Sequence, residues 1–397
     1  MELTSIYLHI PFCRQRCAYC DFNTYAGKEG IIPQYVDAVC REVSWISRSL
    51  DVSVPVHTIY FGGGTPSLLS PDQIGQILQA IKAGLDVQPG VEISIEANPG
   101  TLSGEYLQGL RGMGINRLSI GMQSAHEAEL RLLGRIHSFE DVINSVTWAR
   151  AAGFDNINLD LIYGLPGQPL EDWRRSLELA LRLHPEHFSL YALTLEEDVL
   201  LARWIRRGLV VEQDADMAAE MYELAERLLE TAGYESYEIS NWAQYDGVGN
   251  LRGCKHNMQY WRGKPYLGLG AGAHGYSNHM RTVNALNPEE YINRIRQEFI
   301  PNNYSFPMTP ANIEYNILSS SDEMGEYMMM GLRLTQEGVK EIDFSERFGQ
   351  SLEIAYRWQI DRLIKNELLE WVEGPQRRLR LTKRGRLLGN QVFCEFI

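Results

Sequence analysis

Three cysteines stand within eight residues near the start of the chain. Cys13, Cys17 and Cys20 have the spacing C-x3-C-x2-C and lie between Pro11 and Phe22. A loop of this length can bring three thiolates to one corner of a cubane iron–sulfur cluster, which leaves the fourth iron open to another ligand. The spacing therefore predicts a [4Fe–4S] cluster with one open coordination position.

The same cysteine spacing has two alternative interpretations. A zinc site would need a fourth ligand, which His9 or Asp21 could provide. A redox-active disulfide between two of the thiols is the second alternative. The cysteine spacing, the position after a first strand-like segment, and Tyr19 just before the last cysteine favour the cluster.

Charge and hydropathy exclude several classes of protein. The chain has 397 residues, with 51 acidic against 37 basic side chains and a net charge of −14. This balance argues against the broad positive face that nucleic-acid binding requires, so we expect no nucleic-acid partner. We see neither a run of eighteen apolar residues nor a secretory signal. We expect a cytoplasmic protein, either free or peripheral at the membrane surface.

Strand-like and helix-like segments alternate through the first half of the chain, which indicates a parallel sheet built of βα units. Six units at this spacing suit a partial barrel or an open wound sheet. The expected strands are residues 5–10, 57–61, 92–96, 117–121, 156–162 and 187–192. The clearest expected helices are residues 32–47, 71–82, 139–152 and 170–183.

Polar and glycine-rich signals fall at or near the ends of these strands. Cys13 follows the first strand, the glycines at 62–64 follow the second, Glu96 ends the third, Gln123 follows the fourth, and Asp160 lies near the end of the fifth. The carboxyl ends of parallel strands meet on one face, where α/β folds place their binding sites. We therefore expect these residues to share one site.

The pattern changes near residue 300, so we predict one domain over residues 1–300 and a second over 301–397. Residues 302–303 and 307–310 resemble a linker, and helices are expected at 323–334, 344–348 and 352–366. Two short strands at 368–372 and 379–381 then flank a Gly374-Pro375 turn, and a helix starts at a Thr382 cap. Helices followed by such a wing suggest a winged-helix-like module, and its run of arginines after residue 376 is predicted to be a solvated surface.

Longer motifs narrow the interpretation. C-x3-C-x2-C is the signature of radical S-adenosylmethionine (SAM) proteins, which the chain resembles. Five further strings resemble the oxygen-independent coproporphyrinogen dehydrogenase family, in the family's order. They are YLHIPFC from residue 7, GGGTPS from residue 62, IEANP from residue 95, RLSIGMQS from residue 117 and DLIYGLPGQ from residue 160. The resemblance implies a partial (β/α)6 TIM-type barrel followed by a smaller C-terminal domain.

The same resemblance implies that SAM binds at the open iron and assigns residues to its site. The matching positions are Tyr7, Gly63, Gly64, Thr65, Glu96, Gln123, Arg135 and Asp160. Their chemistry is suitable, because a glycine turn lets backbone amides and carbonyls approach a ligand, a carboxylate can accept from ribose hydroxyls, and an arginine fork can pair with a carboxylate.

Two departures point to one branch of the family. The dehydrogenases carry a fourth cysteine two residues after the third, where this chain has Phe22. The string His256-Asn257-Met258-Gln259-Tyr260-Trp261 resembles the haem-chaperone branch, whose members bind haem and deliver it to respiratory haemoproteins. The resemblance thus implies a haem chaperone that carries haem as cargo. Its partner would be a recipient haemoprotein, which can lie at the membrane surface. The alternative is the SAM-dependent oxidative decarboxylase that acts on coproporphyrinogen III.

The string also has a physical interpretation. Imidazole is a common axial ligand of haem iron, and tyrosine and tryptophan offer flat apolar faces to a porphyrin. We predict that His256, Asn257, Tyr260 and Trp261 contribute to a haem site. His256 either ligates the iron or orients its loop through a hydrogen bond, and His274 is a second candidate ligand.

Overall fold

The computed structural model describes residues 2–50, 53–212, 214–297 and 305–397. One large sheet forms the body of the molecule, and its strand order is β14-β13-β12-β11-β1-β4-β5-β6-β7-β8-β10-β9. The seven parallel strands are β1 (Thr4–Ile10), β4 (Pro55–Gly63), β5 (Asp86–Ala97), β6 (Arg117–Gln123), β7 (Ile157–Tyr163), β8 (His187–Ala192) and β11 (Tyr266–Leu269). Antiparallel strands extend it at both sides, namely β9 (Glu235–Glu238), β10 (Asn241–Ala243), β12 (His274–Ser277), β13 (Met280–Asn284) and β14 (Asn312–Ile317).

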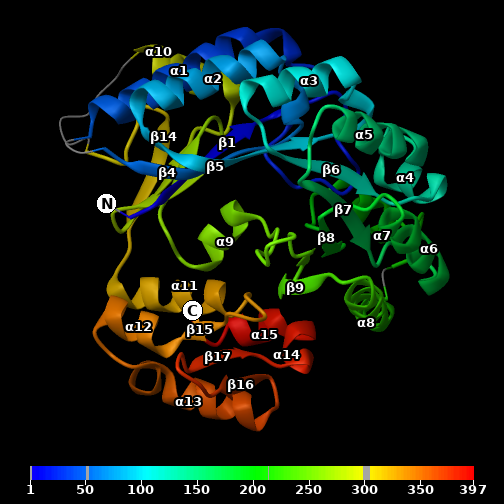
Figure 1. Cartoon of the computed structure of the whole chain (residues 1–397), viewed down its shortest axis with the longest axis vertical. Helices are drawn as coiled ribbons and strands as arrows, with labels where there is room; N and C mark the ends of the chain where they lie inside the picture. The colour runs from blue at the N-terminus through cyan, green and yellow to red at the C-terminus, as the bar shows by residue number, and fades with distance from the viewer. Residues whose placement is uncertain (1, 51–52, 213, 298–304) are drawn as a thin grey trace.

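The six expected strands all form, in the expected order. Helices cover the convex side of the curved sheet, which remains open opposite β5 and β6 and so makes a partial barrel (Figure 1). These helices are α1 (Ile32–Arg48), α2 (Pro71–Gly84), α3 (Gly104–Met113), α5 (Phe139–Ala151), α6 (Leu170–Leu181), α8 (Ala215–Thr231) and α10 (Pro288–Gln297), while α4 (Glu127–Leu133) and α7 (Leu200–Arg206) pack beside Ala18. Single helical turns η1 (Glu29–Ile31), η2 (Pro66–Leu68) and η3 (Pro99–Thr101) occur in the connections.

Local sequence explains where these elements begin. Strand β7 has the sequence INLDLIY, and six of its seven residues are buried, as expected for a parallel strand covered on both faces. Ser70 and Ser138 form capping boxes at the starts of α2 and α5, where the serine side chain accepts a hydrogen bond from the backbone three residues later. The barrel core is a continuous apolar cluster that runs from Ile6 in β1 to Trp242 in β10.

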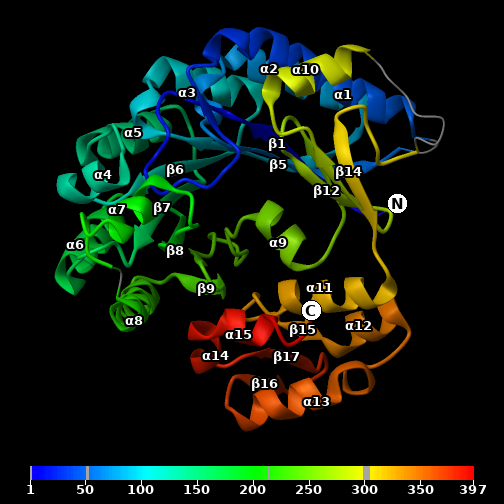
Figure 2. The same ribbon diagram turned by 180° about the vertical axis from the view of Figure 1, so that it is seen from behind.

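The last part of the chain forms a compact unit with its own core around Phe344 and Leu379. It contains α11 (Ser320–Gly331), α12 (Glu341–Phe348), α13 (Leu352–Lys365), α14 (Lys383–Leu387) and α15 (Gly389–Phe393), with a small sheet of β15 (Val339–Lys340), β17 (Arg378–Leu381) and β16 (Leu369–Val372). Helices followed by a β16–β17 wing confirm the winged-helix-like prediction. Figure 2 shows this unit closing the open side of the barrel, with α9 (Lys255–Trp261) between the two.

The region around residue 300 departs in part from the expected linker. The predicted boundary at residue 300 and the linker residues 302–303 lie outside the described residues, and the domain division remains a proposal. Residues 307–310 do not form an exposed linker, because Met308 and Thr309 are buried and the Thr309 hydroxyl donates to Glu42 over 2.8 Å. No helix within the described ranges is both long and apolar enough to pass through a bilayer.

Candidate functional site

The cysteine loop is fixed at several points. Short strands β2 (Phe12–Cys13) and β3 (Tyr25–Ala26) pair in parallel and hold the two ends of the loop. In its middle, the Ala18 amide donates to Leu133 and the Ala18 carbonyl accepts from Leu201, over 2.9 and 2.8 Å. Gly134 is required here, since its φ is +73° and a Cβ would lie 3.2 Å from the Ala18 nitrogen. The loop is thus packed against α4 and α7.

The three thiols line one cavity of about 410 Å³, which we call the cysteine cavity. The Thr65 hydroxyl lies 3.6 Å from the Cys13 sulfur, and the Arg135 guanidinium lies 3.5 Å from the Cys17 sulfur. Burial raises the pKa of the Cys13 and Cys20 thiols. Nearby cations oppose this effect of burial, since the charge of Arg135 acts on Cys13 and that of Arg16 acts on Cys20.

The residues of the cysteine cavity fit an iron–sulfur cluster. Within the described ranges, no three His, Cys, Asp or Glu side chains converge closely enough to hold a single metal ion. A cubane distributes its three thiolates over three iron atoms, so it needs a shared cavity and not a single point of convergence. The buried Nε of Arg135 has no hydrogen-bond partner among the described residues, which leaves a donor available beside the thiols.

The glycine turn after β4 packs directly on the cysteine strand. A Cβ on Gly64 would lie 2.7 Å from the Phe12 carbonyl oxygen and 3.1 Å from the Cys13 sulfur, so a larger residue would displace the loop. The backbone amides of Gly63, Gly64 and Thr65 donate to Glu96, Ile10 and Phe12 respectively. Because these amides are already used, the turn can contact a ligand mainly through its carbonyl oxygens.

Acidic side chains from β5 and β7, on either side of β6, face the same cavity. Glu96 accepts from the Tyr60 hydroxyl over 2.9 Å and from the Gly63 amide over 3.1 Å. Burial, together with the charge of Asp160, raises the pKa of the Glu96 carboxyl to about 7. Asp160 accepts from Ser119 and Asn158, each over 2.8 Å. Both carboxyl groups are therefore oriented before any ligand binds.

The structure brings most of the predicted SAM residues together. The cysteine cavity is lined by seven of them, namely Gly63, Gly64, Thr65, Glu96, Gln123, Arg135 and Asp160. Tyr7 instead lines a neighbouring cavity. Sequence reasoning missed Arg117, Ser119 and Asn158, which also line the cysteine cavity. Their signal was available, because these polar residues alternate along β6 and β7 with apolar ones that face the helices.

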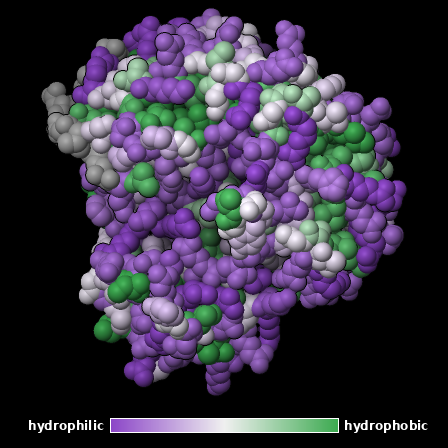
Figure 3. All heavy atoms as spheres, in the orientation of Figure 1, coloured by the Kyte–Doolittle hydropathy of each residue, from purple (hydrophilic) through white to green (hydrophobic). Residues whose placement is uncertain are grey.

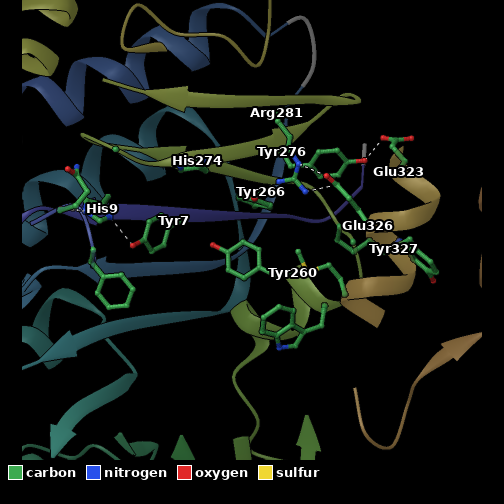
Figure 4. Close-up of a pocket in the computed structure, with 18 of the residues that line it drawn as sticks. Tyr7, His9, Tyr260, Tyr266, His274, Tyr276, Arg281, Glu323, Glu326 and Tyr327 are labelled. Atoms are coloured by element: carbon green, nitrogen blue, oxygen red, sulfur yellow. Dashed lines mark hydrogen bonds and ion pairs between the residues drawn. The ribbon is translucent and has the colours of Figure 1, made fainter. Parts of the chain in front are cut away.

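A second cavity of about 500 Å³ lies between the barrel mouth and α11. We call it the aromatic cavity because Tyr7, Tyr260, Trp261, Tyr266, Tyr276 and Tyr327 line it. Figure 4 shows the five tyrosine rings arranged around the space, with Glu323 and Glu326 on α11 at one side. In Figure 3 the surface is hollowed between the barrel and the C-terminal unit. Phe22, Gly63 and Glu96 line both cavities, so the two are adjacent.

The residues of the His256–Trp261 string on α9 do not all line the same cavity. Tyr260 and Trp261 line the aromatic cavity, as a haem-binding role requires, whereas Asn257 lines the cysteine cavity. The Arg333 guanidinium lies 4.3 Å from the centroid of the Trp261 ring and supports it from the C-terminal unit. One helical turn thus reaches both cavities.

His256 is not placed as a ligand of an iron in the aromatic cavity. It is 1% exposed, its Nδ1 is 2.8 Å from the Thr58 hydroxyl, and its Nε2 is 2.9 Å from the Tyr260 hydroxyl. Burial lowers its pKa to about 3. Of the two roles predicted for His256, the structure favours orientation, because both ring nitrogens are engaged and one of them holds Tyr260.

Comparisons with known proteins agree with this geometry. Residues 7–180 match the model of the radical SAM superfamily, and residues 318–388 match the HemN C-terminal domain. The heme chaperone HemW of Bacillus subtilis is 36% identical over 397 residues, which cover 100% of this chain and 99% of that protein. The heme chaperone HemW of Mycobacterium tuberculosis is 40% identical over 390 residues, 98% of this chain and 93% of that protein.

The fold has a solved counterpart. The structure of the coproporphyrinogen III oxidase HemN from Escherichia coli, a radical SAM enzyme, superposes with a TM-score of 0.81 at 21% identity and covers 99% of this chain and 90% of that one. At this identity the likeness concerns the fold, and it confirms the partial barrel with its C-terminal unit.

Proposed function

The chain belongs to the HemW family of haem chaperones within the radical SAM superfamily, and we propose that it binds haem in the aromatic cavity and passes it to a recipient haemoprotein. The observation that carries this proposal is the aromatic cavity itself. Its volume is about 500 Å³, aromatic rings form much of its lining, and it contains Tyr260 and Trp261 from the family's string. A flat apolar metalloporphyrin is the kind of ligand that such a cavity accepts.

Cationic side chains in the lining of the aromatic cavity suit the propionate edge of haem. Lys264, Arg281 and Arg347 line the aromatic cavity, and each can approach a propionate carboxylate. Arg347 already donates to the Gly263 carbonyl and the Tyr276 hydroxyl, which fixes its guanidinium at the cavity edge. We propose that haem lies with its propionates toward these cations and its apolar edge toward Tyr7 and Phe22.

We also propose that Cys13, Cys17 and Cys20 hold a [4Fe–4S] cluster and that SAM occupies the rest of the cysteine cavity. When bound, the cluster would ligate SAM through its open iron. This chain's own residues would do the positioning: Arg135 stabilises the Cys17 thiolate, Glu96 accepts from ribose hydroxyls, and the Gly63–Gly64 carbonyls accept from the methionine end. The residue assignments rest on their shared cavity and on the match to the family's motifs.

Phe22 argues against the enzymatic alternative. Its side chain is 60% exposed and lines both cavities, where the dehydrogenases have a fourth cysteine. A phenyl ring supplies no thiol for proton transfer or ligation. We therefore expect no conversion of coproporphyrinogen III to protoporphyrinogen IX by the cluster-loaded protein with SAM and a strong reductant.

A haem titration tests the proposal. We expect saturable binding of one haem per chain and a clear loss of affinity in Trp261→Ala. Trp358→Ala is the matched control, because Trp358 is 85% exposed on α13 and does not line the aromatic cavity. Haem binding that is no tighter than to an unrelated acidic protein would refute the proposal, and robust porphyrinogen turnover would favour the enzyme.

A further inference from the structure

The aromatic cavity contains two imidazoles, and they differ in how they are bonded. His9 is engaged at both ring nitrogens: Nδ1 is 3.0 Å from the Tyr7 hydroxyl and Nε2 is 2.9 Å from the Asn23 carbonyl oxygen. His274 is exposed to the cavity, and neither of its ring nitrogens has a hydrogen-bond partner among the described residues. An imidazole that is already bonded at both nitrogens must break a bond to bind iron, whereas His274 need not.

The backbone of His274 is held rigidly while its side chain remains unpartnered. His274 is the first residue of β12 and pairs with Val283 of β13. The strand approaches β11 so closely that a Cβ on Gly268 would lie 2.0 Å from the His274 carbonyl oxygen. Gly272, with φ +76°, sets the turn that leads into the strand. A fixed backbone with a free imidazole is the arrangement that favours a preorganised metal ligand.

The other side chains of the cavity are weaker candidates. Haem iron is ligated by histidine, cysteine, methionine or tyrosine in proteins, and no cysteine lines this cavity among the described residues. Burial raises the pKa of Tyr7, Tyr260 and Tyr266, so these side chains stay as phenols near neutral pH and are poor ligands. Met330 offers a thioether, which is a poorer donor to ferric iron than a neutral imidazole.

From these observations we propose that His274 is the axial ligand of the haem iron, a role that rests on the proposed haem site in the aromatic cavity. Burial and the nearby Arg281 lower the pKa of His274, which keeps the imidazole neutral with its lone pair available. Arg281 itself is held by Glu326 through bonds of 2.9 and 2.5 Å, so it stays beside His274 whether or not haem is present. The β12–β13 hairpin therefore carries both a ligand and a cation for one porphyrin.

The test is a ferric haem titration of wild type, His274→Ala and His279→Asn, followed by absorbance in the Soret region and by EPR spin state. We expect His274→Ala to bind haem about tenfold more weakly or worse and to lose the histidine-ligated spectrum. Imidazole added to the buffer should restore that spectrum in His274→Ala, because it can enter the space left by the side chain. His279→Asn should behave as wild type, since His279 lies on the same hairpin without lining the aromatic cavity and an asparagine amide can still donate to Glu323, the partner of the His279 ring.

The outcomes separate this inference from the proposal on which it rests. If wild type binds haem and His274→Ala keeps the same spectrum and affinity, the ligand assignment is overturned and the haem site stands. If wild type binds no haem, the proposed function itself fails. His274→Gln provides a second variant of similar size, and circular dichroism of both variants should match wild type because the side chain makes no bond within the described parts of the chain.

Discussion

His256 should act on haem binding only through the stability and orientation of α9, and His256→Ala tests this role. The ring is fully buried, stacks on Tyr60 with centroids 5.0 Å apart, and bonds Thr58 and Tyr260. Thr58 keeps a bond to Ser5 of 2.6 Å after the change, but the Tyr260 hydroxyl loses its partner. Because Tyr260 is only partly buried and lines the aromatic cavity, leaving its hydroxyl unpaired costs about 1 kcal/mol, the lower end of the usual range. Adding the cavity left by the ring gives an expected loss of about 3–5 kcal/mol in the free energy of unfolding.

Because the His256 ring is neutral in the folded protein, the free energy of unfolding should decrease as the pH falls. The pKa of His256 is about 3 in the folded protein, and that of an unfolded histidine is about 6.5. Below pH 6.5 the unfolded chain therefore binds a proton that the folded chain does not, and stability is lost as the pH falls. At pH 5 this linkage removes about 2 kcal/mol from wild type. His137, whose pKa burial lowers to about 4, contributes in wild type and variant alike and cancels in the difference.

Urea unfolding followed by circular dichroism at pH 7.5 and pH 5 measures both effects. The gap between wild type and His256→Ala should be about 3–5 kcal/mol at pH 7.5 and should narrow by about 2 kcal/mol at pH 5. A gap below about 1 kcal/mol at pH 7.5, or one that widens toward acid, would refute this account of His256.

Three further results are expected. Reconstituted wild type should hold about four irons per chain. Cys17→Ala should lose the cluster, and Cys40→Ala should keep it. An equal iron content in all three proteins would refute the assignment of Cys13, Cys17 and Cys20 as cluster ligands. Gly64→Ala should also lower the iron content, since the new Cβ would lie 2.7 Å from the Phe12 carbonyl oxygen. Gly112→Ala is the control: its Cβ would have no neighbouring atom within 4 Å, so the change should be neutral or slightly stabilising. SAM binding can be followed by its effect on the EPR spectrum of the reduced cluster. It should weaken as the pH falls through the Glu96 pKa of about 7, because the carboxylate is a better acceptor for ribose hydroxyls than the carboxylic acid. Glu96→Gln should show no such pH dependence, and a pH profile identical to that of wild type would count against this role.

Much of the fold could be predicted from sequence because the barrel strands carry strong local signals. Strand β7 is apolar at six of seven positions, and serine caps mark the starts of α2 and α5. Strand β11 was missed, since its four residues contain a glycine and it becomes a strand only by pairing with β1, about 260 residues earlier in the chain. Such a partner cannot be identified from local periodicity.

The candidate site, like the fold, could be predicted from the sequence only in part. The cysteine cavity was predictable because each of its motifs follows a strand of the same parallel sheet. The separation of Tyr7 from the other SAM residues, and of His256 from Tyr260 and Trp261, depends on which way single side chains point, and the sequence does not specify this. His256 points into the barrel, toward Thr58 of β4, whereas Tyr260 and Trp261 on the same helix face the aromatic cavity.

The basic run near the end of the chain forms a solvated surface only in part, because Lys383 and Arg384 are 73% and 63% exposed at their side chains but other members of the run are paired and partly or fully buried. Arg386 is 9% exposed at its side chain and pairs with Glu226 on α8 over 2.8 Å. Arg377 contacts three glutamates, including Glu341 and Glu353. These pairs fix the C-terminal unit internally and against the barrel, and they explain how a basic run can be used within a chain of net charge −14.

Haem delivery is tested most directly by transfer from the loaded chain. Purified protein carrying one haem would be mixed with the haem-free form of a respiratory haemoprotein in detergent, and the absorbance bands of both would be followed with time. We expect the bands of this chain to disappear as those of the acceptor rise, and we expect the acceptor to load faster than it does from free haem. Haem that stays on the chain, or an acceptor that loads no faster than from free haem, would contradict the assignment as a haem chaperone.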